Sequence, residues 1–512
     1  MIVHFLYPTQ SSCHGFVPKK LVNYPLAQSA AFLAANNVPI KIHGAPGHAD
    51  KEINFDSCFC ASDWVITPLI EGTSCAKTLN TATDLSIKTG ARIVVTSHLA
   101  SIATNEIIEA FPTVSNIIVG EDEASLYELV LGKKKNQPLV IQGQMLDQSL
   151  WEFPTHAHWG EYAALQTSRG CAHLCDFCSS NAITSSIVKP MWRGLPAAKI
   201  YEWLERSIDL GAKFVEIIDS DFLGSNAEGF DRAVILSSMS PLSRTRIMAS
   251  TRADSVVRNP YLIKKLAEFG FVKWQIGVES ADQQTLNRYS KGFSPEISMQ
   301  AIDILLSLNI SVRLEFIMFE PWSTFLTLRA NLFFLRQLFA KGIFIRRALF
   351  NRLRIGRWSP SIFSILSKTG RLRRHIFPLY DYVDDDPDVA CIFSTLRSIH
   401  TKSVGAALTL AELLERLLDL DAFTDRVAIN RSLSNLDEML LNMVEDVVNN
   451  KGRRDVPVIT ASLEHYISQW VKNASLWLIV PQADIAFPGI SKIICRALQS
   501  INTAAVKVGV SS

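Results

Sequence analysis

The first 130 residues alternate short apolar runs with helix-like stretches. Runs rich in β-branched and aromatic residues predict strands at residues 2–8, 39–44, 64–70, 92–98 and 116–120. Helix-like segments between these strands cover residues 26–37 and 78–90. Strands that alternate with helices in this way are typical of an open parallel sheet. The pattern therefore predicts a Rossmann-like α/β sheet at the start of the chain.

The carboxyl ends of these strands are the positions at which an open parallel sheet binds ligands. Four candidate positions follow the predicted strands: Pro8, Ser97, His98 and the loop from Gly120 to Glu123. Residues 131–160 mix a lysine run with glycine, proline and glutamine, which predicts a linker. We expect a first domain over residues 1–150 that includes most of this linker.

A second alternating series follows residue 190. It predicts strands at residues 213–221, 246–254, 271–280 and 310–319. It predicts helices at residues 197–211, 228–239, 260–270 and 295–309. Strands about 30 residues apart are typical of successive βα units in a barrel or partial barrel. We expect a partial (β/α)6 barrel over residues 151–325, with catalytic groups at strand carboxyl ends, and a mostly helical domain over residues 326–512.

The overall composition excludes several classes of protein. The 512 residues are 48% hydrophobic and 20% charged, which is ordinary for globular chains, and the net charge of +2 gives no basic field for nucleic acid. No uninterrupted apolar run approaches the roughly 18 residues that span a bilayer. The nine cysteines, an odd number over a long chain, do not suggest a disulfide framework. We expect a cytoplasmic protein without a nucleic-acid or membrane partner.

Three of the cysteines lie within eight positions, as Cys171, Cys175 and Cys178. A structural zinc site would need a fourth ligand at similar spacing, and no cysteine or histidine pair supplies it. A 4Fe-4S cluster held by three cysteines leaves one iron free to bind a small molecule. His173, in the same loop, is an alternative fourth ligand.

The spacing C-x-x-x-C-x-x-C with Phe177 before the last cysteine resembles the radical S-adenosylmethionine (radical SAM) superfamily. The resemblance implies that the cluster cleaves SAM to a 5′-deoxyadenosyl radical. The segment "KWQIGVES" is similar to the family's fourth strand, which approaches the cofactor's ribose. The SAM contacts that the resemblance implies are Phe177, Asp219, Arg252, Glu279, Ser280 and Arg313.

The sheet that precedes the barrel resembles the cobalamin-binding subgroup of this superfamily. The segment "NIIVGEDEASLYELV" is similar to the subgroup's fifth strand and its Gly-Glu-x-Glu loop. The subgroup's usual glycine pair after the fourth strand is replaced by Val95 to His98, and no cobalt-ligating Asp-x-His-x-x-Gly signature is present. The cobalamin contacts that the resemblance implies are Pro8, Ser97, His98, Gly120, Glu121 and Glu123.

These resemblances imply a cobalamin-dependent C-methyltransferase that tailors a natural product or a peptide. A member of the same subgroup that catalyses cyclisation, rearrangement or epimerisation is the alternative, and a non-catalytic iron–sulfur redox protein is a further one. The expected partners are a small-molecule or peptide substrate and an electron donor such as flavodoxin or ferredoxin. No residue in the sequence identifies the substrate.

An arginine-rich segment lies in the C-terminal region and comprises Arg346, Arg347, Arg352, Arg354 and Arg357. These side chains could attract an anionic substrate. The alternative is that they form ion pairs with the acidic run Asp384, Asp385, Asp386 and Asp388.

Overall fold

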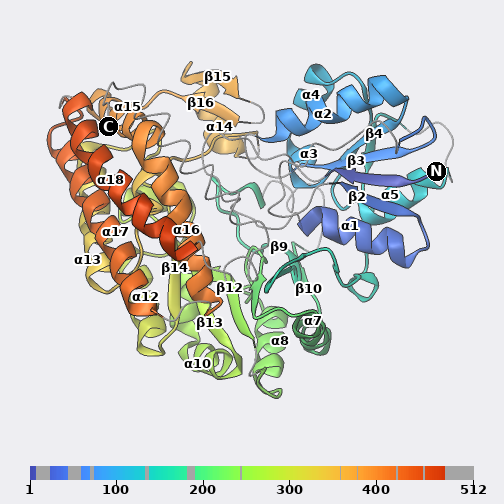
Figure 1. Cartoon of the computed structure of the whole chain (residues 1–512), viewed down its shortest axis with the longest axis horizontal. Helices are drawn as coiled ribbons and strands as arrows, with labels where there is room; N and C mark the ends of the chain where they lie inside the picture. The colour runs from blue at the N-terminus through green and yellow to red at the C-terminus, as the bar shows by residue number, and fades with distance from the viewer. Residues whose placement is uncertain are drawn as a thin grey trace.

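The structure is a computed structural model, in which two six-stranded sheets lie side by side and a helical layer covers the second sheet (Figure 1). It describes residues 1–6, 24–43, 59–69, 74–132, 138–180, 191–242, 245–357, 359–376, 379–421, 425–453 and 456–478. Among these residues no helix combines the length and apolar character needed to cross a membrane.

The N-terminal sheet has the strand order β2-β1-β3-β4-β5-β6, and every neighbouring pair is parallel. Its strands are β1 (Val3–Leu6), β2 (Ile40–His43), β3 (Trp64–Pro68), β4 (Arg92–Thr96), β5 (Val114–Val119) and β6 (Val140–Gln142). The helices that connect them are α1 (Tyr24–Ala35), α2 (Ser74–Thr89), α3 (His98–Ile102), α4 (Thr104–Ala110) and α5 (Glu123–Val130). All residues of β1 and β3 are buried, because helices cover both faces of the sheet. The predicted open parallel sheet is confirmed.

Strand β6 corrects the prediction of a linker over residues 131–160. Its three residues pair in parallel with β5, so this part of the segment completes the sheet. The strand escaped prediction because three residues between a lysine run and a glycine carry too short a pattern.

The second sheet has the order β14-β13-β12-β11-β8-β7. Its strands are β7 (His158–Trp159), β8 (Tyr162–Leu165), β11 (Phe214–Ile217), β12 (Arg246–Arg252), β13 (Phe271–Glu279) and β14 (Ser311–Phe316). Strands β8 and β11 to β14 are parallel, and β7 pairs antiparallel with β8. A parallel bridge between Phe319 and Arg352 continues the series after β14. The predicted partial barrel is confirmed, with β8 as a first strand that the sequence had not indicated.

The helices of the barrel are α7 (Ala197–Asp209), α8 (Ala227–Ser237), α9 (Ala253–Arg258), α10 (Pro260–Phe269), α11 (Gln283–Arg288) and α12 (Pro295–Ser307). A short antiparallel hairpin, β9 (Ser168–Gly170) with β10 (Trp192–Gly194), follows β8. The cysteine-rich segment starts where β9 ends, so the first barrel strand and this hairpin place it at the carboxyl edge of the sheet.

The C-terminal region is mostly helical, as predicted, but it also contains a hairpin that the sequence had not indicated. Its helices are α13 (Phe325–Ala340), α14 (Pro360–Lys368), α15 (Pro387–Ile399), α16 (Gly405–Asp419), α17 (Arg426–Asn449) and α18 (Val456–Leu478). The hairpin is β15 (Leu372–Ile376) with β16 (Leu379–Tyr382). A π-helical turn, His400–Val404, joins α15 to α16.

Helix α16 packs along the open side of the partial barrel through buried ion pairs (Figure 1). Lys273 of β13 contacts Glu415 at 3.0 Å and Asp419 at 2.8 Å. Arg416 of the helix contacts Glu216 of β11 at 3.6 Å. These buried contacts hold α16 against the open side of the partial barrel.

The arginine-rich segment is largely occupied by ion pairs within the protein, which agrees with the ion-pair interpretation rather than with attraction of an anionic substrate. Arg346 is buried between Asp437 at 2.7 Å and Glu415 at 3.0 Å. The remaining pairs join Arg347 to Glu412, Arg352 to Asp381 and Asp384, and Arg357 to Glu106. Of the predicted acidic partners, only Asp384 pairs with this segment in the described structure.

Candidate active site at the barrel mouth

The cysteine loop begins directly after Gly170, the last residue of β9, whose φ of 84° favours glycine. Cys175 is buried, and Cys171 and Cys178 are partly buried. Asp176 holds the middle of the loop, because its carboxylate accepts from Ser290 at 2.7 Å and from Ser361 at 3.2 Å. The loop is thus fixed from the barrel and from the C-terminal region at once.

The three thiols fit an iron–sulfur cluster by their chemistry. Burial raises the pKa of Cys171 to about 12 and also raises the pKa of Cys175, so unbound thiolates are disfavoured here. Metal coordination offsets that cost, since a coordinating thiol is deprotonated outright. In the described part of the chain, no group of three or more His, Cys, Asp and Glu side chains is placed to hold a single ion. A cluster needs only one thiolate at each of its irons.

His173 was the alternative fourth ligand. Its Nε2 lies 3.7 Å from Oδ2 of Asp221, and burial lowers the pKa of His173 to about 4. The imidazole is therefore neutral near pH 7, so this approach is not an ion pair.

Arg252 is the cation nearest to the cysteine loop among the predicted contacts. It ends β12, and its Nη1 donates to Sγ of Cys175 at 3.7 Å. Its Nε donates to Asp254 at 2.9 Å, and its Nη2 donates to the carbonyl of Lys291. These three contacts fix the guanidinium beside the cluster position.

Glu279 stands at the end of β13 in a left-handed conformation, with φ of 68°. The pairing of β13 with β14 shifts between Gly277 and Glu279, and such an irregularity re-aims a side chain. Lys291 donates to Oε1 of Glu279 at 3.1 Å. Burial raises the pKa of Glu279, and the lysine opposes that rise. Glu279 and Lys291 therefore form a buried, hydrogen-bonded pair at the barrel mouth.

Asp219 and Ser280 are occupied by contacts within the protein. The carboxylate of Asp219 accepts from the backbone and hydroxyl groups of Thr167 and Ser168, between 2.6 and 2.9 Å, and from Arg232 at 3.2 Å. The hydroxyl of Ser280 donates to Asn331 and accepts from the backbone of Asp282, both at 3.1 Å. Both residues fix the strand ends around the site.

Phe177 packs beside Tyr289, with ring centroids 4.8 Å apart, and Nζ of Lys291 lies 5.9 Å from its ring centre. The structure thus brings Phe177, Arg252 and Glu279 together around the cysteine loop. It does not bring Arg313 there. Arg313 pairs in register with Gln275, four residues before Glu279, and its guanidinium lies near Glu216 and Glu412.

The carboxyl edge of the N-terminal sheet carries the predicted cobalamin positions that can be described. Ser97 has φ of 82° and ψ of −176°, a region that essentially only glycine adopts. Gly120 has φ of 98°, and its N–H donates to Ser101 at 2.8 Å. Glu121 and Glu123 form ion pairs with Arg169 of β9. Pro8 and the side chain of His98 lie outside the described residues.

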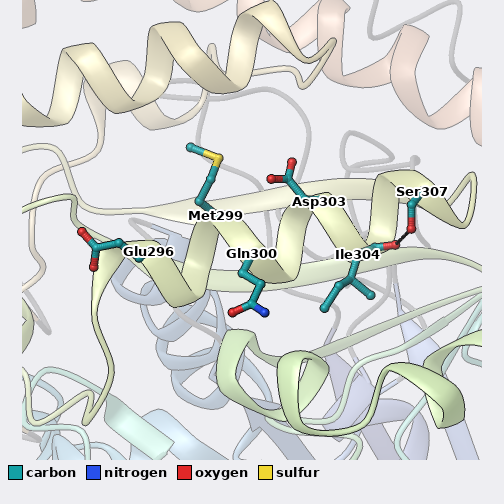
Figure 2. A pocket seen from close by; sticks show the side chains of 6 residues that line it. All are labelled: Glu296, Met299, Gln300, Asp303, Ile304 and Ser307. Carbon is teal, nitrogen blue, oxygen red and sulfur yellow. Dashed lines mark hydrogen bonds between the residues drawn. The ribbon is translucent and has the colours of Figure 1, made fainter.

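Two hollows lie away from these edges. A cavity of about 330 Å³ is lined by residues 350, 352–355, 379–382, 393, 396, 397, 400 and 401 together with Phe319. Its wall residues Leu353 and Ile355 belong to the apolar cluster against which Phe177 packs. A wider hollow of about 540 Å³ is lined by residues of α12 alone (Figure 2). One helix supplies every wall of that hollow, so it forms no enclosed site.

Sequence reasoning missed three residues that shape the site. Lys291 pairs with Glu279, Gly277 leaves room for that pair, and Arg169 joins the cysteine hairpin to the N-terminal sheet. The signal for Arg169 was its place two residues before Cys171. The partners of all three lie far away in the sequence or across a strand bulge, so no local pattern indicated them.

Comparisons with known proteins agree with this geometry. Residues 165–322 match the model of the radical SAM superfamily. An anaerobic magnesium-protoporphyrin IX monomethyl ester cyclase from Synechocystis is 24% identical over 246 residues, 42% of this chain. The matched segment is 46% of the cyclase, less than half its length.

Two solved structures share the fold. The cobalamin-dependent radical SAM enzyme OxsB with aqua-cobalamin bound has a TM-score of 0.67 at 16% identity, over 99% of this chain and 80% of that chain. The radical SAM methyltransferase TsrM from Kitasatospora setae, with tryptophan and a SAM analogue bound, has a TM-score of 0.56 at 14% identity, over 73% of this chain and 78% of that chain. The cysteine loop, the strands around it and the matched residues 165–322 identify this chain as one that carries a domain of the radical SAM superfamily.

Proposed function

We propose that this protein is a cobalamin-dependent radical SAM enzyme whose first candidate reaction is methyl transfer to an unactivated carbon. One observation carries the radical chemistry: in a fixed loop with three cysteines, Cys175 lies beside Arg252 and close to the Glu279–Lys291 pair. A 4Fe-4S cluster on these thiolates would supply the electron that cleaves bound SAM. The family to which the domain belongs implies both groups.

Several residues of this chain would hold the cluster and SAM. Cys171, Cys175 and Cys178 would bind three irons and leave the fourth open. Arg252 and Lys291 place two positive charges beside Cys175, where they would favour the electron-rich cluster and the carboxylate of SAM. Glu279 would accept a hydrogen bond from the ribose of SAM. Asp219 and Ser280 keep the strand ends in place through hydrogen bonds within the protein.

Cobalamin is proposed for the carboxyl edge of the N-terminal sheet, which faces the cysteine hairpin (Figure 1). Ser97 lies after the fourth strand, where the subgroup has its glycine pair. It adopts a backbone conformation that favours glycine. The resemblance to OxsB, which extends over nearly the whole chain, supports this placement. We also propose the division into residues 1–150, 151–325 and 326–512.

A second candidate reaction is ring formation or rearrangement without methyl transfer. The named cyclase among the relatives favours it, whereas the likeness to TsrM, a methyltransferase, favours methylation. The substrate in either case is a small molecule or a peptide, and a flavodoxin or ferredoxin is the proposed electron donor.

One assay separates these proposals. The anaerobically reconstituted protein is incubated with SAM, a reductant, and hydroxocobalamin, and the products are separated by chromatography. 5′-Deoxyadenosine is expected in both cases, and S-adenosylhomocysteine forms only if a methyl group moves. Corrin absorption that stays with the protein through gel filtration supports cobalamin binding. Absence of 5′-deoxyadenosine would contradict the radical function, and loss of all corrin on the column would contradict the cobalamin part.

A further inference from the structure

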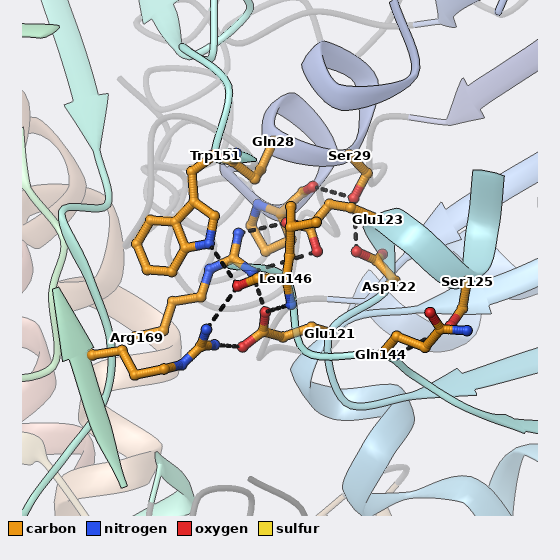
Figure 3. A network of polar contacts seen from close by, with 12 residues as sticks. Gln28, Ser29, Glu121, Asp122, Glu123, Ser125, Gln144, Leu146, Trp151 and Arg169 are labelled. Carbon is orange, nitrogen blue, oxygen red and sulfur yellow. Dashed lines mark hydrogen bonds and ion pairs between the residues drawn. The ribbon is translucent and has the colours of Figure 1, made fainter. Parts of the chain in front are cut away.

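A network of charged side chains joins the N-terminal sheet to the strand that leads into the cysteine loop (Figure 3). Arg169 of β9 lies two residues before Cys171. Its Nη1 donates to Oε2 of Glu121 at 2.7 Å, and its Nη2 donates to Oε1 of Glu123. All three side chains are largely buried. The contact therefore links the end of β5 directly to the start of the cysteine loop.

A second arginine completes the link. Arg193 of β10 stands opposite Arg169 in the hairpin and bonds to the other oxygen of Glu121. It also donates to the carbonyl of Leu146 at 2.8 Å. The ring of Trp151 lies 4.4 Å from the guanidinium carbon of Arg169 and 5.6 Å from that of Arg193. Arginines from both strands of the cysteine hairpin thus meet at Glu121, and Arg169 also binds Glu123.

The carboxylates are themselves anchored to the N-terminal sheet. Gly120 is held by Ser101, and Asp122 accepts from Ser29 of α1 at 2.9 Å. Glu123 is the first residue of α5 and is buried, so the helix fixes its backbone. The loop from Gly120 to Glu123 is therefore fixed to the N-terminal sheet. Through Arg169 and Arg193 it restrains the β9–β10 hairpin.

The geometry is specific to arginine. A guanidinium bonds two carboxylates in one plane, which a lysine ammonium cannot reproduce. Removal of one partner in such a buried set leaves an uncompensated charge, whereas an exposed pair contributes little. Two arginines against two glutamates leave the network neutral.

From these contacts we propose that Glu121 and Glu123 are positioning residues that hold the β9–β10 hairpin, and with it Cys171, against the edge of the N-terminal sheet. They act through Arg169 and Arg193 and touch no cofactor. The proposal rests on the proposed function in that it assigns a cluster to this loop. Under it, the edge proposed for cobalamin and the loop proposed for the cluster are one mechanical unit.

The test measures thiol reactivity in the full-length protein without a cluster. Alkylation rates of Cys171, Cys175 and Cys178 are followed by mass spectrometry, and the exposed Cys60 and Cys391 serve as internal references. The double variant Glu121→Gln with Glu123→Gln is expected to be alkylated about tenfold faster at Cys171, with the reference cysteines unchanged. Glu445→Gln, which weakens the Arg336–Glu445 pair between α13 and α17, is the matched control and is expected to leave all rates unchanged.

Arg169→Lys is the milder variant and keeps the charge while losing the two-point contact. It is expected to give an intermediate alkylation rate at Cys171. If the double variant does not fold, the rate of Arg169→Lys tests the proposal. After reconstitution, the EPR signal of the reduced cluster is expected to shift in Arg169→Lys and not in Glu445→Gln.

Unchanged alkylation of Cys171 in a folded Arg169→Lys or double variant overturns the positioning proposal. So does an equal rise at the reference cysteines, since that reports general loosening. These outcomes are independent of the proposed function, whose own failure is the absence of 5′-deoxyadenosine from the wild-type protein.

Discussion

Gly277 and the carboxylate of Glu279 share one space in β13, because a Cβ on Gly277 would lie 2.6 Å from Oε1 of Glu279 and 3.1 Å from Nζ of Lys291. Glycine is needed here for close approach rather than for its backbone freedom. Gly277 therefore decides whether the buried Glu279–Lys291 pair can form where the cofactor is proposed to bind.

Replacing Gly277 with alanine tests that relationship. The added methyl group displaces Glu279 or Lys291, so Gly277→Ala is expected to weaken SAM binding about tenfold, a loss of about 1.4 kcal/mol. Equilibrium binding of SAM to the reconstituted protein measures the effect. Gly405→Ala is the matched control, since its Cβ would meet its nearest neighbour at 3.4 Å. Equal affinities for the two variants would refute the assignment of this pair to the SAM site.

Ser97 is expected to store backbone strain. A residue with a side chain in this region costs about 1–3 kcal/mol, whereas glycine adopts it freely. The hydroxyl of Ser97, however, donates to the carbonyl of Leu69, and glycine loses that bond. Strain relief outweighs the bond, so Ser97→Gly is expected to raise the free energy of unfolding by about 1 kcal/mol. Urea denaturation monitored by circular dichroism checks this, and a lower midpoint with an unchanged slope contradicts it.

The buried ion pairs that join Arg346 to Glu415 of α16 and Asp437 of α17 are expected to be sensitive to single changes. Asp437 is fully buried and accepts from the backbone N–H of Ile345 at 2.6 Å and from Arg346 at 2.7 Å. Asp437→Asn leaves Arg346 with less compensation and is expected to cost about 3 kcal/mol, against less than about 1 kcal/mol for the more exposed Glu445→Gln. Differential unfolding in urea compares the two. Similar losses of unfolding free energy for the two variants would mean that these ion pairs are not coupled to the stability of the barrel.

Asp122 is expected to make stability depend on pH. Burial, and next the charge of Glu123, raise the pKa of Asp122 to about 7 from an ordinary value near 3.8. Between about pH 4 and 7 the native state therefore binds a proton that the unfolded state has released. Its contribution to the free energy of unfolding falls as pH rises through this window, by at most about 1.4 kcal/mol per pH unit. Asp122→Asn should remove that slope in unfolding measurements at several pH values, and an identical slope in the variant contradicts the assignment.

The alternation of strands and helices in the sequence was sufficient to predict both sheets, because buried parallel strands and amphipathic helices differ in period. Strands β6 and β8 escaped prediction. They are only three and four residues long, and pairing with longer neighbours rather than their own pattern makes them strands. The hairpin β15–β16 likewise depends on packing against distant segments.

The site residues also divide into those that the sequence indicated and those whose contacts only the structure shows. The cysteines and Glu279 were predicted from local sequence motifs, which can be recognised without knowledge of the fold. Asp219 and Ser280 are taken up by internal hydrogen bonds, and Arg313 lies deeper in the barrel, because strand register places a side chain in a way that no short motif encodes. The contacts of Lys291 and Arg169 could be recognised only in the structure, because their partners do not adjoin them in the sequence.

The most direct test of the central claim is the yield of 5′-deoxyadenosine from SAM under anaerobic reduction. The variant with serine at Cys171, Cys175 and Cys178 is compared with Cys391→Ser, which alters an exposed cysteine outside the loop. The account predicts that the triple variant binds no iron and forms no 5′-deoxyadenosine above background, while Cys391→Ser matches the wild-type protein. Wild-type rates from the folded triple variant would contradict the account.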